Sequence, residues 1–316
     1  MIIDIPTPDE LARSSVDLLN LAWETAFDIL YDLEESGVEE WDDDGTARRD
    51  YHAASQPSLG NALAIVQQAQ ELALKSRIAA ISPYLLLSGD PREWPRQCDK
   101  NDTAFTSFRT IDASDLIRVH DAVCNKRLDA KFVQIFTETR RKRNVIIHLG
   151  GKGQIFNLED LLLLILETFR HLFPNKRWAQ TRYEFKLRDR NTQIYGPDFV
   201  EAVLVHQFNQ LTRVLGAKDL RTHFGFEKKQ HRYICFHCTA EERNRSGETT
   251  PLAQLRPNTP EATTLYCCVC DKEYPVERRY CSHPNCKSNV ISTDKGWEGT
   301  CHMCMTEARA PTEGET

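Results

Sequence analysis

Apolar residues recur at helical spacing through the first 175 residues of this 316-residue chain. The first helical segment is preceded by the sequence TPDE, which is a typical N-terminal cap, and Pro83, Gly150 and Pro174 follow the later ones as helix-ending residues. A short helix is expected to start at Asp112, and a polar loop is expected up to Ser58. The main helical segments, joined by short or polar connections, predict an antiparallel bundle over residues 1–175. These segments are 11–33, 61–81, 128–149 and 157–173.

The pattern changes after residue 175. Residues 176–230 form a helical or irregular connecting region, in which TRYEFKLRDRNTQIYG (181–196) indicates a strand and 197–216 a helix that begins near Pro197. Cysteines, aromatic residues and turn residues dominate residues 231–306, as is typical of small β modules. Residues 307–316 are polar and are expected to form a flexible tail. The expected fold class is therefore α+β, mainly α.

Eight of the eleven cysteines occur as closely spaced pairs. Two such pairs on facing turns form the closed tetrahedral site that structural zinc prefers. No secretion signal is visible at the N-terminus, so metal thiolates in a reducing cytoplasm are favoured over disulfides. Two structural Zn²⁺ ions are therefore predicted, one held by Cys235, Cys238, Cys267 and Cys270 and the other by Cys281, Cys286, Cys301 and Cys304.

The identity of individual metal ligands stays open at this point. Cys268 can take the place of Cys267, and His283 or His302 can replace a cysteine of the second set. Residues 231–306 resemble tandem zinc ribbons, which bind nucleic acid, bind protein or have only a structural role. A site closed by four thiolates leaves no position for a reactive water, so no catalysis is expected there.

The segment RKRNVIIHLG (141–150) places polar residues at a suggestive spacing on the third main helix. At about 100° per residue, Arg143, Asn144 and His148 fall on one side, and Val145, Ile146 and Leu149 fall on the side expected to face the core. Asn144 and His148 are four residues apart, so the amide can orient the imidazole. Ile147 lies between the polar groups, where an exposed side chain suits a partner helix. A surface arginine and a structural histidine are the alternative interpretation.

With the motif RNVIIH on this helix and AQELALKSRI on an earlier one, residues 1–175 resemble the HEPN superfamily of helical-bundle proteins. The resemblance implies a metal-independent endoribonuclease in which the motif helices of two protomers form one composite site. Arg143, Asn144 and His148 match the catalytic motif of the family. Bacterial members are commonly toxins or phage-defence effectors, which implies an antitoxin or another protein partner. Glu71 and Lys75 either support this site or, as the sequence favours, form an ion pair on the helix surface.

The side chains suit RNA cleavage, because RNA supplies its own nucleophile in the 2′-hydroxyl. A near-neutral imidazole at His148 can transfer the proton, and Arg143 can stabilise the charge that develops on the phosphate. Arg140, Arg141 and Lys142 either bind neighbouring phosphates of the substrate or form a solvated basic face.

Composition limits the remaining functional classes. The formal charge of −6 does not require a polyanionic partner, and no run of 18 apolar residues predicts a membrane span. The acidic stretch 32–44 is expected to be a solvated loop rather than a shield for the basic site. The competing interpretation is a non-catalytic HEPN scaffold whose ribbons bind nucleic acid or protein. A zinc-dependent regulator of DNA is a third possibility, but the sequence has no helix-turn-helix pattern to support it.

Overall fold

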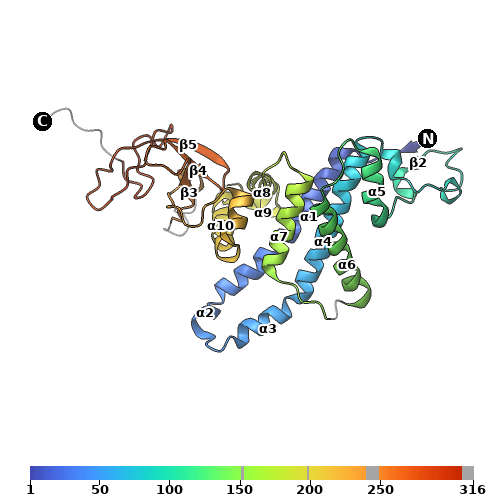
Figure 1. Ribbon diagram of the computed structural model, residues 1–316, viewed down its shortest axis with the longest axis horizontal. Coiled ribbons are helices and arrows are strands. Elements are labelled where there is room, and N and C mark those ends of the chain that lie inside the picture. The colour runs from blue at the N-terminus through green and yellow to red at the C-terminus, as the bar shows by residue number, and fades with distance from the viewer. Residues whose placement is uncertain (151–152, 198, 240–248, 308–316) are drawn as a thin grey trace. The chain divides into compact units, whose positions relative to one another are not determined.

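The computed structural model describes residues 1–150, 153–197, 199–239 and 249–307 (Figure 1). The chain divides into two compact units, Met1–Asn175 and Lys176–Thr316. The bundle expected from the sequence also ends at residue 175. The fold is mainly helical with a small antiparallel sheet near the C-terminus, which confirms the expected fold class at this level. Most of the predicted tail lies outside the described residues.

The first unit contains the predicted helices, with ends shifted by a few residues. Its first helix has the capping box indicated by TPDE: Thr7 accepts a hydrogen bond from the Glu10 amide, and the Glu10 side chain accepts one from the Thr7 amide. A two-residue parallel pairing joins β1 to β2. The elements are β1 (Ile2–Ile3), α1 (Pro8–Glu35), α2 (Val38–Trp41), α3 (Thr46–Ala54), α4 (Gln56–Ala79), η1 (Pro83–Leu86), η2 (Pro91–Glu93), β2 (Thr103–Ala104), η3 (Phe105–Ser107), α5 (Ala113–Val123), α6 (Ala130–Leu149) and α7 (Leu158–Leu172).

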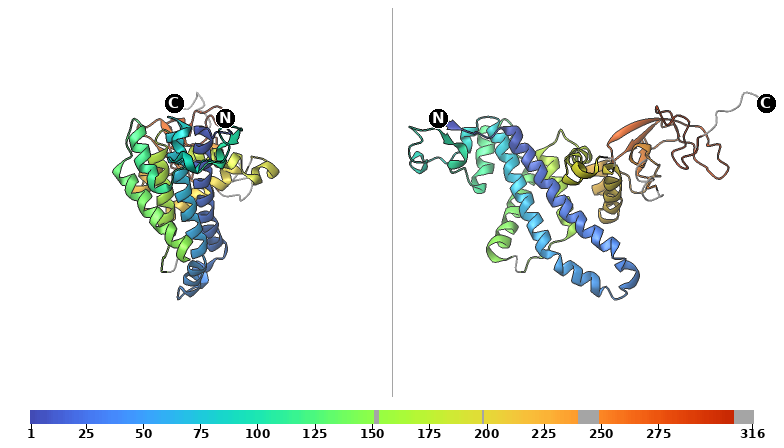
Figure 2. Two further views of the ribbon diagram at one scale, coloured as in Figure 1. Left: turned by 90° about the vertical axis from the view of Figure 1, so that its right-hand side faces the viewer. Right: turned by 180° about the vertical axis from the view of Figure 1, so that it is seen from behind.

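Helix α4 lies at the centre of this unit and packs against α1, α5, α6 and α7. Helices α1 and α4 run antiparallel along their length (Figure 2). The Ser15 hydroxyl donates to the Ala69 carbonyl at 2.7 Å, and the Ser76 hydroxyl donates to the Pro8 carbonyl at 2.8 Å. Both hydroxyls bond to the backbone of the neighbouring helix, so these interactions fix the register of the pair.

The stretch before Ser58 was predicted as a polar loop, and this prediction is wrong. Helices α2 and α3 and the start of α4 occupy most of it. Asp42 explains the helix at α3: its carboxylate accepts hydrogen bonds from the amides of Ala47 at 3.0 Å and Arg48 at 3.1 Å. The Asp42 side chain is only 3% exposed. One acidic residue of the stretch 32–44 therefore satisfies the first turn of a helix rather than contacting solvent.

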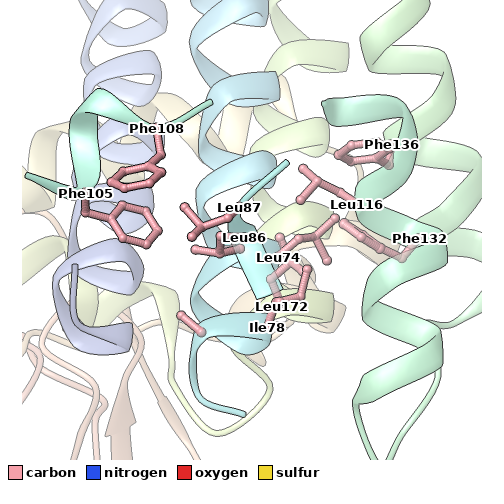
Figure 3. Packing of buried hydrophobic residues seen from close by; sticks show 12 residues of the cluster. Leu74, Ile78, Leu86, Leu87, Phe105, Phe108, Leu116, Phe132, Phe136 and Leu172 are labelled. Carbon is pink, nitrogen blue, oxygen red and sulfur yellow. The ribbon is translucent and has the colours of Figure 1, made fainter. Parts of the chain in front are cut away.

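A cluster of buried apolar side chains fixes α5 and α6 against α4 (Figure 3). Leu116 of α5 and Phe132 and Phe136 of α6 are at most 2% exposed. Leu74 and Ile78 of α4 meet them from the other side. The first half of α6 is thus anchored in the core, whereas residues 140–148 of the same helix are half-buried or exposed.

The second unit combines helices with a four-stranded antiparallel sheet in the order β3-β4-β5-β6. The strand predicted at 181–196 is wrong, because α8 and α9 cover this stretch. Buried residues lie at positions 178, 181, 182 and 186, which is helical spacing. The elements are α8 (Trp178–Leu187), α9 (Arg190–Tyr195), α10 (Val200–Val214), α11 (Ala217–Phe224), β3 (Ala253–Leu255), β4 (Thr264–Cys267), β5 (Lys272–Glu277) and β6 (Ile291–Ser292).

An ion-pair network joins the N-terminal part of α6 to α7. Lys131 and Arg170 both contact the Glu167 carboxylate, at 2.9 and 2.8 Å. Burial alone would raise the pKa of Glu167, but hydrogen bonds from Arg170 and Lys131 outweigh it and lower the pKa from 4.5 to about 2. A carboxylate with a lowered pKa stabilises the fold above its unfolded pKa, and this contribution is lost as the pH falls towards the folded value.

We therefore expect Glu167→Gln to lower the free energy of unfolding by about 1 kcal/mol at pH 7, after allowance for solvent screening of the network. The deficit should shrink as the pH falls from about 5 towards 3, because the parent carboxylate then approaches its folded pKa. Urea unfolding followed by circular dichroism across this range measures both effects. The exposed Glu40 provides the control, since Glu40→Gln should change stability by less than about 0.5 kcal/mol. A deficit that does not depend on pH would contradict the assignment.

Candidate functional site

The eight paired cysteines form two clusters with the grouping that their spacing indicated. In the first, Cys235 and Cys270 have their sulfurs 3.8 Å apart, and Cys238 and Cys267 have theirs 3.7 Å apart. In the second cluster the corresponding distances are 3.6 Å for Cys281 with Cys304 and 3.7 Å for Cys286 with Cys301. A tetrahedral ion bonded to four sulfurs at about 2.3 Å separates neighbouring sulfurs by about 3.8 Å. Both clusters therefore fit one four-coordinate metal ion each.

The sheet positions the first cluster. Strand β4 ends at Cys267, and the turn into β5 carries Cys270. Asp271 in this turn has a φ of +58°, which bends the chain back within the short connection. Hydrogen bonds from the Cys235, Cys238 and Cys267 thiols lower the pKa of Cys270. Four thiols held this close together suit binding of a divalent cation, which releases their protons.

The alternative ligands that the sequence left open have other partners. The Cys268 thiol donates to the Leu252 carbonyl at 3.6 Å, and burial raises its pKa well above the ordinary value. His283 accepts the Asn285 amide at its Nδ1 atom, at 3.4 Å. His302 lies on Phe236, with ring centroids 4.2 Å apart, and its Nδ1 is 2.7 Å from the Ile234 carbonyl. The two clusters therefore consist of the eight cysteines that the sequence predicted as metal ligands.

His302 links the two cysteine clusters, a role that the sequence did not indicate. Its carbonyl accepts the Ile234 amide at 2.8 Å, and its ring contacts the Ile234 carbonyl. Ile234 precedes Cys235 of the first cluster and His302 follows Cys301 of the second. Burial lowers the pKa of His302 to about 4, so the ring is neutral near pH 7.

The motif residues of α6 separate into two groups. Arg143 and Asn144 are half-buried, and the Arg143 guanidinium donates to the Asn144 amide oxygen at 3.1 Å. His148 is exposed on the last turn of the helix. The described residues show no hydrogen bond from Asn144 that orients His148, and the Asn144 amide oxygen accepts from Arg143. No hydrogen bond joins Arg143 to His148 among the described residues of one chain.

The apolar positions of the same turn lie at the edge of the bundle. Val145 and Ile146, expected to face the core, are half-buried, and Ile146 lies beside Gly60 of α4. The side chain of Leu149, the third residue of that set, lies outside the described residues. Ile147 is 52% exposed, between the polar groups. This part of α6 thus has an apolar residue available to a partner.

Arg143 and Asn144 line a polar hollow of about 340 Å³ between α4, the start of α5 and α6. Arg140 also lines it, and has no ion-pair or hydrogen-bond partner among the described residues. Arg141 and Lys142 differ, because both contact Glu138, at 2.8 and 4.0 Å. The basic run is therefore divided between two environments. The other residues that line the hollow are Gln67, Glu71, Asp112, Ala113 and Ser114.

Glu71 and Lys75 have separate partners rather than the ion pair favoured from the sequence. The Gln67 amide donates to the Glu71 carboxylate, and Lys75 donates to the Thr110 hydroxyl at 3.4 Å. Glu71 lines the hollow, and Lys75 is not among its lining residues. The sequence identified Asp112 as a helix start, but only the packing of α5 and α6 against α4 shows that the first turn of α5 borders Arg140 and Arg143.

Comparisons with known proteins leave the chain without a match: no protein-family profile, curated protein or solved structure is significantly similar to it. Within the described residues, no helix combines the length and apolar character needed to cross a membrane.

The two adjacent cysteines at the end of β4 provide a matched test of the metal ligands. We expect the parent protein to contain two metal ions per chain and Cys267→Ser to contain one, because a serine hydroxyl replaces one of four thiolates. Cys268→Ser should retain two, since its hydroxyl can still donate to the Leu252 carbonyl. Elemental analysis of purified protein measures the stoichiometry and identifies the metal. Loss of metal in Cys268→Ser, or its retention in Cys267→Ser, would contradict the ligand assignment.

Proposed function

We propose that the protein is a metal-independent endoribonuclease of HEPN type that acts as a homodimer. The observation that carries this proposal is the arrangement on α6: a half-buried Arg143 in a polar hollow, an exposed His148 on the last turn, and an exposed Ile147 between them. No hydrogen bond joins Arg143 to His148 within the described part of one chain. A second copy that packs against this part of α6 completes the site by bringing an imidazole to each guanidinium.

In this proposal the protein stabilises charge and transfers protons, while the RNA provides the nucleophile. His148 takes the proton of the 2′-hydroxyl, the 2′ oxygen attacks the adjacent phosphorus, and the bond to the 5′ oxygen breaks. The imidazole of the second subunit gives the leaving oxygen its proton. Arg143 donates to the phosphate oxygens, where negative charge increases in the transition state. The product is a 2′,3′-cyclic phosphate or its hydrolysis product.

The two metal clusters have a structural and recognition role in this scheme. Zinc is the metal that best suits four thiolates at these distances, and a closed site does not activate water. The first 175 residues have a formal charge of −9 (19 basic and 28 acidic residues), whereas the rest of the chain has +3 (21 and 18). The second unit is therefore the better partner for a polyanion, and we assign it RNA recognition.

A non-catalytic scaffold is the second candidate. It is favoured by one observation, namely that Asn144 bonds to Arg143 and leaves His148 without the amide contact that was expected to orient its ring. In that case the second unit binds RNA or a protein partner, and the α6 residues have no chemical role.

Cleavage in the presence of EDTA separates these candidates. We expect the parent protein to cleave mixed single-stranded RNA and His148→Ala to be at least about 100-fold slower, because it lacks the group that transfers protons. The exposed His52 on α3 supplies the control, and His52→Ala should cleave at the parent rate. Gel analysis of end-labelled RNA, with identification of the cyclic phosphate, measures the outcome. Binding without cleavage by all three proteins would identify a scaffold.

Dimerisation has its own test at Ile147. We expect Ile147→Glu to convert the dimer to monomers, because it places a charge where an apolar side chain meets its copy. Light scattering coupled to gel filtration gives the mass of both proteins. Ile155→Glu, at a residue that is 90% exposed, serves as the control for an added charge elsewhere on the surface and should leave the dimer intact. A parent protein that is monomeric at micromolar concentration would exclude the composite site.

A further inference from the structure

We propose that the polar hollow beside α6 binds the guanosine whose 2′-hydroxyl attacks, so that the enzyme cleaves RNA on the 3′ side of guanosine. This inference rests on the proposed ribonuclease function and names its substrate preference. The hollow, of about 340 Å³, is at the small end of the range of about 300–1,000 Å³ that is typical of ligand sites. It contains groups suited to a phosphate on one side and to a base on another.

Two guanidiniums form the phosphate side. Arg140 and Arg143 line the hollow one helical turn apart on α6. Arg140 has no ion-pair partner in the described part of the chain, and Arg143 bonds only to the neutral amide of Asn144 there. Neither charge is neutralised by a recorded ion pair, whereas the neighbouring Arg141 and Lys142 share Glu138. The two arginines of the hollow are thus the members of the basic run available to an anion.

The first turn of α5 adds to the phosphate side. Ala113 and Ser114 line the hollow, and Asp112 at the N-cap makes no side-chain hydrogen bond to this turn. The Asp112 carboxylate instead contacts Arg109 at 3.1 Å, which compensates the charge of Asp112. Backbone amides at the start of a helix lack partners within the helix and favour anions. They supplement the arginines as phosphate donors.

Glu71 and Gln67 form the base side. Glu71 is a half-buried carboxylate that lines the hollow and accepts a hydrogen bond from the Gln67 amide. A carboxylate is acceptor-only, so it selects a base that presents donors. Guanine presents two adjacent donors on its Watson–Crick edge, N1–H and the 2-amino group, which match the two oxygens of one carboxylate. Uracil presents one donor between two acceptors, and it therefore pairs poorly with Glu71.

The same geometry relates the hollow to the cleavage step. Arg143 belongs both to the hollow and to the proposed catalytic motif, so the phosphate next to it is the one that reacts. A guanosine held at Glu71 with its 3′-phosphate at Arg140 and Arg143 places its 2′-hydroxyl beside that phosphate. The imidazole of the second subunit then reaches the site from the open side of α6.

Binding of guanosine 3′-monophosphate to the full-length protein tests the inference without any cleavage. We expect it to bind at least about ten-fold more tightly than uridine 3′-monophosphate, as measured by calorimetry. Inosine 3′-monophosphate, which lacks the 2-amino group, should bind the parent protein about ten-fold more weakly than guanosine 3′-monophosphate does. Glu71→Gln should remove the preference for guanosine and retain weak binding of both nucleotides. Equal binding of guanosine, inosine and uridine nucleotides would overturn the base side.

Adjacent arginines give a matched test of the phosphate side. Arg140→Gln should weaken the binding of both nucleotides about ten-fold. Arg141→Gln removes the same charge from a side chain that is paired with Glu138, so this variant should bind both nucleotides like the parent. Equal effects of the two substitutions would overturn the phosphate side.

A single-stranded RNA of ten nucleotides with one guanosine, compared with the same RNA without it, connects the hollow to the reaction. Cleavage only at the 3′ side of the guanosine supports the inference, and cleavage without base preference overturns it while leaving the ribonuclease proposal intact. Selective binding of the guanosine RNA by a protein that cuts neither RNA would refute the ribonuclease and retain the guanosine site. Selective binding of the free nucleotide alone would refute an RNA site.

Discussion

The packing of several helices on the broad buried face of α4 is the constraint on which the rest of the first unit depends. Its buried residues cover about half of the helix circumference, and many of them are small, so neighbouring helices can approach closely. A buried face of this width needs more than one helix to cover it, and α1, α5, α6 and α7 pack against α4. The positions of α5 and α6 follow from it, and with them the position of the polar hollow.

Helix α6 serves two purposes along its length. Phe132 and Phe136 hold its first half in the core, so residues 140–148 extend from a fixed base. Functional groups on a rigid element are positioned more accurately than groups on a loop. In the second unit, two clusters of four cysteines that could each hold a metal ion lie among short strands, where such ions commonly add stability. In the first unit, buried apolar residues thus hold the helix that carries the polar side chains of the hollow.

Particular elements show how far sequence patterns extend. Helices with a strong apolar periodicity, such as α1 and α7, have nearly the predicted bounds, because their burial depends on their own sequence period. The helices at 38–54 and 178–195 were missed, since the former depends on hydrogen bonds to the buried Asp42 and the latter buries polar residues such as Arg182 and Lys186. The spacing of apolar residues does not reveal helices that depend on buried polar side chains.

The sequence by itself determined the helical bundle, the grouping of eight cysteines and the helix that carries Arg143 and His148, because all three depend on spacing along the chain. Only the tertiary structure decided that Arg140 and Arg143 share a hollow with Glu71 and the start of α5, while Arg141 turns to Glu138. It also decided that Cys268 and His302 bond to carbonyl groups instead of completing a metal site. The physical reason is that the partner of a polar side chain is set by which elements pack beside it, and that packing joins residues distant in sequence.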